Sequence, residues 1–391
     1  MIFIKNKEER LMKKMKRTLA AILAMTFLTG CGGNKAADQT TNAPGSEATT
    51  NSASTASSTE AAELDTKKVI ETAANAGKVG NWGLGNEYEI LALLAKYNLP
   101  TEYLSQDFTM DGFDDDSVTL ASAMTYNELG LVKNSYDGGY GYGDSVKYID
   151  MNDEGVAMME DNIFTTKKFA EENPETVKAF LYASLKGWED AVKDPKAAAE
   201  IVFEAGSSVS KDHQEYMASE VAKLVTTDTK GNTVSDYGNM DDEAMQQTLD
   251  IAKKYVTLDD AKAQEKFASL TLDDIRDKQY IEAAKSGDGK FSPEKKEVSI
   301  QLKWLPQAQF MGYYVAAAKG YYDEVGLKVN IVSGGGDIAE TTAVNNGTVD
   351  FGVTWETNLA AADAGGMDLL EIAQIYQRSG LVLVYKPENF K

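Results

Sequence analysis

Short apolar strand patterns alternate with helix patterns from residue 298 to residue 385, and this alternation constrains the fold most strongly. Val298–Leu302 and Leu327–Val332 are typical of strands, and the segment Ala308–Lys319 between them is typical of a helix. Strands at 349–353, 369–374 and 381–385 follow, with a helix at 358–364. Such alternation predicts an open, largely parallel α/β sheet, whose ligands bind at loops beyond the carboxyl ends of the strands.

The same pattern begins earlier in the chain. Lys78–Trp82 is predicted to be a strand, a glycine loop follows, and Glu87–Tyr97 is predicted to be a helix. Residues 118–126 are predicted to pass from a helix into a strand, and residues 146–151 to form another strand. Helix patterns then run from Asn173 to residue 255. Trp188 falls on the apolar face of the first of these helices, so we expect it in the core.

Composition excludes several functional classes. The 391 residues include 61 acidic and 39 basic side chains, which gives a formal net charge of −22 and argues against nucleic-acid binding. With one Cys and one His, the chain can form neither a disulfide framework nor a Cys-based metal site. Any hydrolytic triad would need His213, which lies among polar neighbours and is predicted to be a solvated helix start without a role.

The N-terminal segment is predicted to be a lipoprotein leader. Basic residues at 13–17 precede the apolar run Leu19–Leu28, which is too short to span a bilayer, and Leu28-Thr29-Gly30-Cys31 forms a lipobox pattern. We therefore expect residues 1–31 to be the signal segment and Cys31 to be lipidated. Residues 32–64, rich in Ser, Thr and Ala, are expected to be a disordered linker that tethers an extracytoplasmic protein to the cell membrane.

Several motifs resemble one family. They are Gln301–Phe310, Gly312–Ala316, Lys319–Tyr322, Gly334–Asp337, Val349–Gly352 and Gln374–Gly380, together with Gly85–Glu89, Met124–Glu128 and Ile163–Thr166. These motifs are similar to those of solute-binding proteins of ABC importers that resemble thiamine-pyrimidine synthase. Binders of thiamine pyrimidine precursors and of riboflavin belong to this family. The last three motifs belong to the second half of such proteins, yet here they come first.

The resemblance implies a two-lobed, type II periplasmic-binding-protein-like α/β fold with a hinge. The exchanged order of the motifs predicts a circular permutation, and a truncated or fused gene product is the alternative. With a permuted chain, residues 65–151 are expected to form one lobe and residues 152–391 the other, joined by a single crossing. Residues 286–297 would then be a linker between the family's original ends.

Two tryptophans are candidate ligand-binding residues. Trp304 follows a strand at a loop, where its ring can stack on a planar heterocycle, although a place in the core would also explain it. Trp355 follows the strand at 349–353, at the end where ligands of such sheets bind. The family motif adds Gln309 and Tyr314 to these candidates.

The candidates from the other block are mainly polar. Glu87, at a helix start, either caps the helix or accepts hydrogen bonds from ring N–H groups. Tyr126, Asn127 and Glu128 form a cluster that would face Trp304 across a cleft. The glycine loop at 334–336, including Gly335, either lets the backbone approach the ligand or makes a tight turn, and Asp337 is expected to cap the next helix.

The resemblance implies a binding protein rather than an enzyme. The family's namesake enzyme uses a cofactor lysine and a donated histidine, and Thr354 and Asn358 occupy those positions here. We therefore expect no cofactor and no metal, a monomer that delivers a flat nitrogen heterocycle to an ABC permease and its ATPase, and no enzymatic activity. Gln309-Phe310 replaces the Asn-His pair of the pyrimidine binders, which favours a larger ring system. An extracytoplasmic sensor lobe is the third possibility.

Overall fold

The computed structural model describes residues 64–207 and 209–391. Cys31, the predicted leader at 1–31 and nearly all of the predicted linker at 32–64 lie outside these residues. Within the described part of the chain, none of the helices combines the length and the apolar character that a membrane crossing requires.

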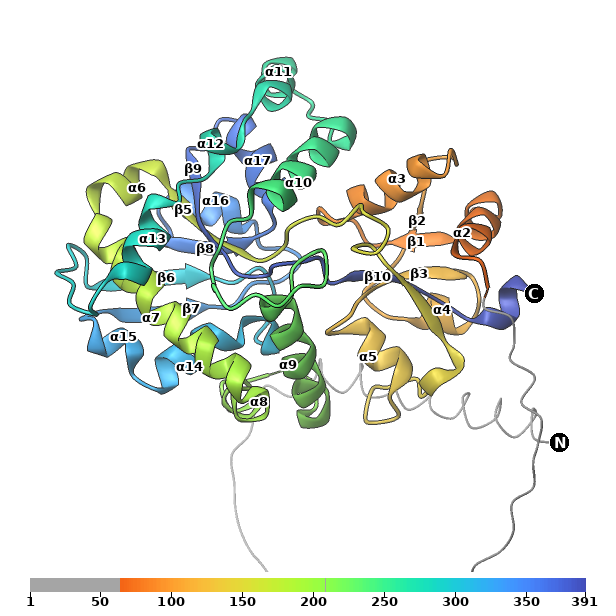
Figure 1. Ribbon diagram of the computed structural model, residues 1–391, viewed down its shortest axis with the longest axis horizontal. Coiled ribbons are helices and arrows are strands. Elements are labelled where there is room, and N and C mark those ends of the chain that lie inside the picture. Colours follow the sequence, from red (N-terminus) through yellow and green to blue (C-terminus); the bar gives the residue numbers. More distant parts are fainter. Residues whose placement is uncertain (1–63, 208) are drawn as a thin grey trace, which may run out of the picture. The chain divides into compact units, whose positions relative to one another are not determined.

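The smaller lobe is built on a five-stranded sheet in the order β2-β1-β3-β10-β4 (Figure 1). Neighbours β2, β1 and β3 are parallel, and β10 runs antiparallel to both β3 and β4. The strands are β1 Val79–Asn81, β2 Leu104–Ser105, β3 Leu120–Met124, β4 Lys147–Asp150 and β10 Leu381–Tyr385, with helices α2 Thr66–Asn75, α3 Glu87–Lys96, α4 Asp111–Asp114 and α5 Glu128–Lys133, and short 3-10 turns η1 Gly143–Ser145 and η3 Pro387–Phe390.

The larger lobe has the same arrangement, in the order β7-β6-β8-β5-β9. Here β5 is the antiparallel strand between β8 and β9, while β6 is parallel to β7 and β8. Its strands are β5 Asn162–Thr166, β6 Glu297–Gln301, β7 Lys328–Val332, β8 Phe351–Thr354 and β9 Leu369–Gln374. Its helices are α6 Lys167–Glu172, α7 Pro174–Lys193, α8 Pro195–Glu204, α9 Lys211–Thr226, α10 Asp242–Tyr255, α11 Ala261–Ser269, α12 Leu272–Ile275, α13 Gln279–Ser286, η2 Ala308–Phe310, α14 Met311–Ala318, α15 Tyr321–Glu324, α16 Glu340–Asn345 and α17 Glu356–Ala364.

The expected division of the chain into lobes at 65–151 and 152–391 is wrong, because β10 belongs to the smaller lobe. Leu383 of β10 pairs with Ser122 on one side and with Ile149 on the other. The chain therefore crosses between the lobes twice, at 151–161 and at 375–380 (Figure 1). Each lobe receives its antiparallel strand from the segment that has just crossed, so neither lobe is contiguous in sequence.

The two crossings lie side by side and bury acidic groups. Asn152 and Ser379 exchange hydrogen bonds between them, with the Asn152 amide donating to the Ser379 carbonyl at 2.9 Å. Glu160 accepts from the Gly380 N–H at 3.0 Å, and Glu89 of α3 accepts from the Met158 N–H. Burial raises the pKa of both carboxyls, and neighbouring carboxylates add to the rise.

Helix starts and close packing explain much of the larger lobe. Pro174 occupies the first turn of α7, and the Asp241 carboxylate caps α10 by accepting from the Ala244 N–H at 2.9 Å. Trp188 is buried, as the sequence predicts. It lies against α14 at Gly312, where an added Cβ would come within 2.2 Å of the indole ring, so only glycine allows the two helices to pack this closely.

Candidate functional site

A cavity of about 130 Å³ lies where loops of the two lobes meet. The smaller lobe contributes residues that follow β1, β2 and β3, and the larger lobe contributes residues that follow β6 and β8. Because the strands of an open sheet place their carboxyl ends at one edge, this is the expected place for a ligand. The inner cavity, as we call it, is lined by Trp82, Leu84, Phe108, Met124, Tyr126, Asn127, Glu128, Lys303, Trp304, Gln307, Gln309 and Trp355.

Aromatic rings make up much of the wall of the inner cavity. Trp304 from the larger lobe meets Phe108 from the smaller lobe, with ring centroids 5.1 Å apart. Trp82 and Trp355 add two more large faces, and Trp355 is almost fully buried. Such rings favour flat aromatic ligands, which they stabilise by stacking and by excluding water.

Hydrogen-bond acceptors gather at the polar side of the inner cavity. The Glu128 carboxylate accepts from the Met124 N–H at 2.9 Å and from the Asn127 amide at 2.8 Å. Burial raises the pKa of the Glu128 carboxyl. The Tyr126 hydroxyl makes no hydrogen bond to the described residues, and it faces the same space. Ring N–H or amino groups of a ligand would find partners here.

Asp161 supports this wall from behind. Its carboxylate accepts from the Gln309 amide at 2.8 Å and from the Trp355 indole N–H at 2.9 Å, so it fixes two cavity-lining side chains from the larger lobe. Burial raises the pKa of Asp161 to about 7, although both hydrogen bonds act in the opposite direction. Asp161 lies at the end of the first crossing, with φ of +43°, and its position in the sequence carried no signal.

A second cavity of about 310 Å³ adjoins the first and shares Leu84, Lys303 and Trp304 with it. We call it the outer cavity. It is bounded by the glycine loop after β7 and by the starts of α3 and α17. An added Cβ at Gly334 would lie 2.1 Å from the Leu302 carbonyl, so close packing requires this glycine. Its lining is Leu84, Gly85, Glu87, Tyr88, Lys303, Trp304, Gly335, Gly336, Ile338, Glu340 and Asn358.

Lys303 stands at the junction of the two cavities. It is 9% exposed, and its ammonium donates to Glu340 at 3.1 Å and lies 4.5 Å from the centroid of the Trp355 ring. The same Glu340 oxygen accepts from the Thr354 hydroxyl at 2.6 Å. Lys303 and Gln307 lie close to Trp304 within the Gln301–Phe310 motif. Their place in this motif is a sequence signal by which they could have been predicted.

The structure brings eight of the ten sequence-predicted ligand-binding residues to the two cavities. Two others do not reach either cavity: Tyr314, half-buried on α14, packs against the core, and Asp337 is exposed. Asp337 also fails to cap α16, which begins three residues later after Ala339. The eight are Trp304, Gln309, Trp355, Tyr126, Asn127 and Glu128 in the inner cavity, Glu87 and Gly335 in the outer one, and Trp304 in both.

His213 is not a solvated residue, contrary to the expectation from its polar neighbours. It is 1% exposed, and its two ring nitrogens meet the Tyr136 hydroxyl at 2.6 Å and the Asn127 amide oxygen at 2.8 Å. Because the Asn127 NH₂ already donates to Glu128, its oxygen must accept from His213 Nε2–H, and Tyr136 then donates to Nδ1. Burial lowers the pKa of His213 to about 4, so the ring is neutral.

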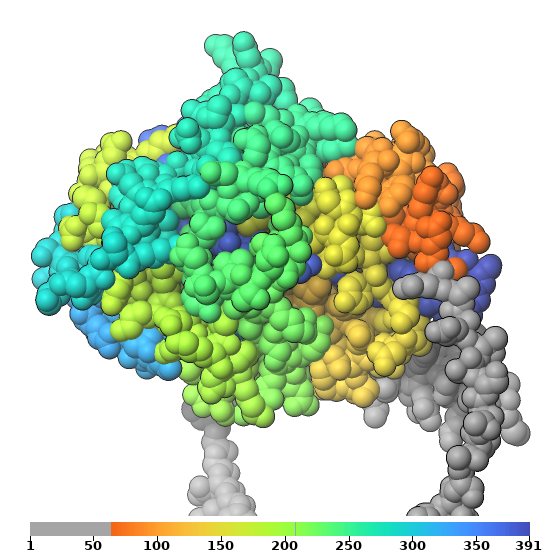
Figure 2. Space-filling view, viewed as in Figure 1, coloured from red at the N-terminus to blue at the C-terminus, as the bar shows by residue number. Residues whose placement is uncertain are grey.

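The lobes touch on both sides of the cavities. On one side, α9 of the larger lobe lies against the smaller lobe (Figure 2). There the Tyr216 hydroxyl donates to the Thr125 carbonyl at 2.7 Å. On the other side, α17 reaches the loop after β1. There the Asn358 amide donates to the carbonyl of Leu84, a residue with φ of +74°, at 3.1 Å. These contacts close the two lobes around the cavities.

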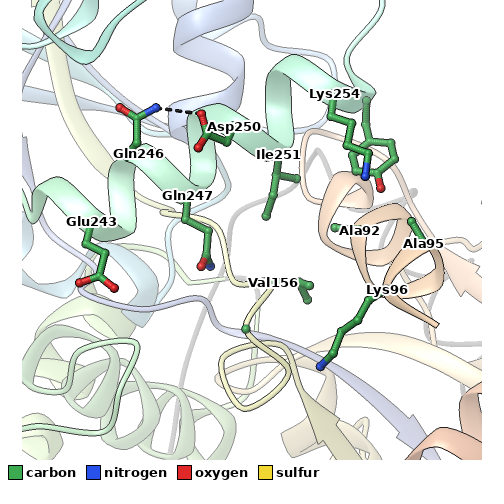
Figure 3. A pocket seen from close by; sticks show the side chains of 12 residues that line it. Ala92, Ala95, Lys96, Val156, Glu243, Gln246, Gln247, Asp250, Ile251 and Lys254 are labelled. Atoms are coloured by element: carbon green, nitrogen blue, oxygen red, sulfur yellow. Dashed lines mark hydrogen bonds between the residues drawn. The ribbon is translucent and has the colours of Figure 1, made fainter. Parts of the chain in front are cut away.

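A larger cavity than these two lies between α3 and α10 (Figure 3). It measures about 680 Å³, and its lining includes long polar side chains such as Lys96, Gln247 and Lys254. Binding sites for small organic ligands are usually lined by apolar and aromatic side chains, with a few converging polar groups. The inner cavity fits that description better, although it is smaller.

The fold and the site together define a class: an α/β protein of the two-lobed type II periplasmic-binding-protein fold, with cavities between its lobes. The chain belongs to the NMT1/THI5-like family, a family of solute-binding proteins, whose sequence pattern matches residues 74–198 and 307–390, together more than half of the chain. A domain that is permuted or interrupted by an insertion gives such a split match. The permutation itself stays a prediction.

One curated relative is the riboflavin-binding protein RibY of Chloroflexus aurantiacus. It is 32% identical to this chain over 88 residues. The matched segment spans 22% of this chain and about a quarter of the length of that relative. The relative is named as a binding protein and not as an enzyme.

Proposed function

We propose that this protein is the substrate-binding component of an ABC importer and that it binds a flat nitrogen heterocycle between its lobes. The observation that carries the proposal is the inner cavity, whose lining combines the rings of Trp304, Phe108 and Trp355 with the Glu128 carboxyl. Aromatic faces hold a planar ring, and a carboxylate accepts hydrogen bonds from its N–H groups.

Riboflavin and a thiamine pyrimidine precursor are the candidate ligands. The RibY relative supports riboflavin, as does Gln309-Phe310 in place of the pyrimidine binders' pair. The inner cavity is about the size that holds one six-membered ring. A pyrimidine would fill it, whereas a tricyclic flavin would extend past Lys303 and Trp304 into the outer cavity.

The test is calorimetry of riboflavin, a formylated aminopyrimidine and taurine with wild-type protein and with Trp304→Ala. We expect one heterocycle to bind and Trp304→Ala to weaken it about 5- to 150-fold, since stacking on an aromatic is worth about 1–3 kcal/mol. Trp304→Phe retains an aromatic face and should lose less. Tight taurine binding, or unchanged heterocycle affinity in Trp304→Ala, would refute the stacked-heterocycle proposal.

Two other functions are less well supported. Enzymatic synthesis of the pyrimidine would need the namesake's lysine and histidine, but Thr354 here is buried and bonded to Glu340, and Asn358 bonds the Leu84 carbonyl. An extracytoplasmic sensor would use the same cleft. The neighbouring gene discriminates, since an importer protein is expected beside a permease gene and a sensor beside a kinase gene.

We also propose that Cys31 is acylated and anchors the protein to the outer face of the cell membrane. The lipobox pattern before this single Cys supports the proposal, which lies outside the described residues. In fractionated cells, Cys31→Ala should move the protein from the membrane fraction to the soluble or secreted fraction. An unchanged membrane-bound fraction would show that this cysteine is not the anchor.

A further inference from the structure

Carboxyl groups outnumber ammonium groups in the lining of the two cavities, and this imbalance bears on which form of a ligand they accept. Among the described lining residues, the acidic side chains are Glu128 in the inner cavity and Glu87 and Glu340 in the outer cavity. Lys303 is the basic one, and it lines both. Asp161 adds a further carboxyl directly behind Gln309.

Lys303 is already committed to an internal partner. Its ammonium pairs with Glu340 at 3.1 Å, and both side chains are at most 9% exposed, so solvent screens this pair little. The ammonium also lies over the Trp355 ring. An anionic ligand group would have to displace Glu340 from Lys303 and leave a buried carboxylate without its cation.

Two N–H groups of the glycine loop beside Lys303 already have acceptors within the protein. The Gly334 N–H already donates to the Trp304 carbonyl at 2.9 Å, and the Ile338 N–H donates to the Gly335 carbonyl at 2.9 Å. Glu87 lines the same outer cavity as this loop, and one of its oxygens accepts from the Gly85 N–H at 2.7 Å. Carboxylates and carbonyls of this kind accept hydrogen bonds from hydroxyl groups and repel phosphate.

We infer that the outer cavity binds an uncharged, hydroxylated part of the ligand and rejects the phosphate ester of the same ligand. The reason is that the Lys303 ammonium is already paired with the Glu340 carboxylate. This inference rests on the proposed function and names the ligand class more narrowly: a free heterocyclic alcohol such as riboflavin or a hydroxymethylated aminopyrimidine. Glu340 and Lys303 are then the residues that determine this specificity.

The test compares each heterocyclic alcohol with its own phosphate ester by calorimetry on the whole protein. For wild-type protein we expect the ester to bind about 100-fold more weakly, since placing like charges together costs several kcal/mol. Glu340→Gln leaves the Lys303 ammonium unpaired at nearly unchanged volume. This variant should reduce the ratio of alcohol affinity to ester affinity about tenfold or more.

Two control variants separate this effect from a general loss of charge. Glu87→Gln removes the same charge from the same cavity without freeing Lys303, so it should narrow the ratio much less than Glu340→Gln. The double change Glu340→Gln with Lys303→Gln should cancel the gain in ester binding. Thermal melting of each variant confirms that it is folded.

The outcomes distinguish this inference from the proposed function. Wild-type protein that binds an ester as tightly as its free alcohol overturns the inference and leaves heterocycle binding intact. An unchanged ratio in Glu340→Gln also overturns it. If neither riboflavin nor the aminopyrimidine binds, the proposed function fails, and the inference fails with it.

Discussion

The Glu160 side chain, in the first crossing between the lobes, is a buried carboxyl. Glu160 is 2% exposed, one of its oxygens accepts from the Gly380 N–H, and the other has no partner among the described residues. Burial raises the pKa of its carboxyl to about 8, with Asp161 adding to the rise and Lys303 opposing it. A buried carboxyl in this setting is protonated at neutral pH, so the first crossing contains no uncompensated charge at Glu160.

The sign of the resulting pH dependence follows from proton binding. Between pH 4.5 and about 8 the folded protein holds the Glu160 proton and the unfolded chain does not, so the stability that Glu160 contributes is lost as the pH rises. Each such group changes the free energy of unfolding by at most about 1.4 kcal/mol per pH unit.

Glu160→Gln therefore should gain stability relative to wild type as the pH rises from 5 to 8. The amide keeps the acceptor for Gly380, places an NH₂ where an oxygen had no partner, and cannot ionise. Urea unfolding across this pH range measures the difference. Exposed Glu171→Gln on α6 is the control, and parallel pH profiles for wild type and Glu160→Gln would contradict the argument.

At the scale of the elements, most strands and helices could be predicted from the sequence, but the connection at residues 375–380 was predicted wrongly. The pattern at 381–385 is the strand β10, but an apolar run that is buried on both faces fits the middle of either sheet. Residues 375–380 are long enough for a turn within a lobe and also for a crossing to the other lobe. Only the pairing with β3 and β4 decides between them.

The site could be predicted in part, for related reasons. Trp304 and Trp355 were found because they follow strands, where ligands of such sheets bind. Phe108 and Asp161 belong to irregular segments without periodicity, so no pattern pointed to them. The burial of His213 had a signal that polar neighbours obscured: Met217, Val221 and Val225 follow it at intervals of four residues, and all are buried on one face of α9.

At the scale of the whole molecule, the two lobes are held together by several contacts, and for the proposed binding function we expect these contacts to set how tightly a ligand is retained. The lobes are joined covalently at the two crossings, and they touch again through His213 and Tyr216 of α9 and through Thr357 and Asn358 of α17. Opening either side would widen the path by which a ligand leaves the space between the lobes. Hinge closure around a ligand is a common form of conformational change in two-lobed proteins.

His213 links this closure to the site. Tyr136 and Asn127, its two partners, belong to the smaller lobe, and Asn127 in turn donates to Glu128 in the inner cavity. Opening on this side breaks two hydrogen bonds to a buried ring and loosens the side chain that orients a cavity carboxylate. The closed arrangement therefore should lose stability when the imidazole is removed, even though His213 does not line either cavity.

We expect His213→Ala to weaken binding of the heterocycle roughly 5- to 30-fold, corresponding to about 1–2 kcal/mol of lost hydrogen bonding. The loss should appear as faster dissociation with little change in association, because the open form still presents the same rings. Stopped-flow fluorescence measures both rates.

The dissociation rate of Tyr136→Phe, which removes one of the two hydrogen bonds, should fall between the rates of wild type and His213→Ala. Lys211→Ala, on the exposed face of α9 and paired with Glu200 inside the larger lobe, should change neither rate. If His213→Ala lowers the melting temperature but leaves the dissociation rate as in wild type, His213 stabilises the fold without holding the lobes closed.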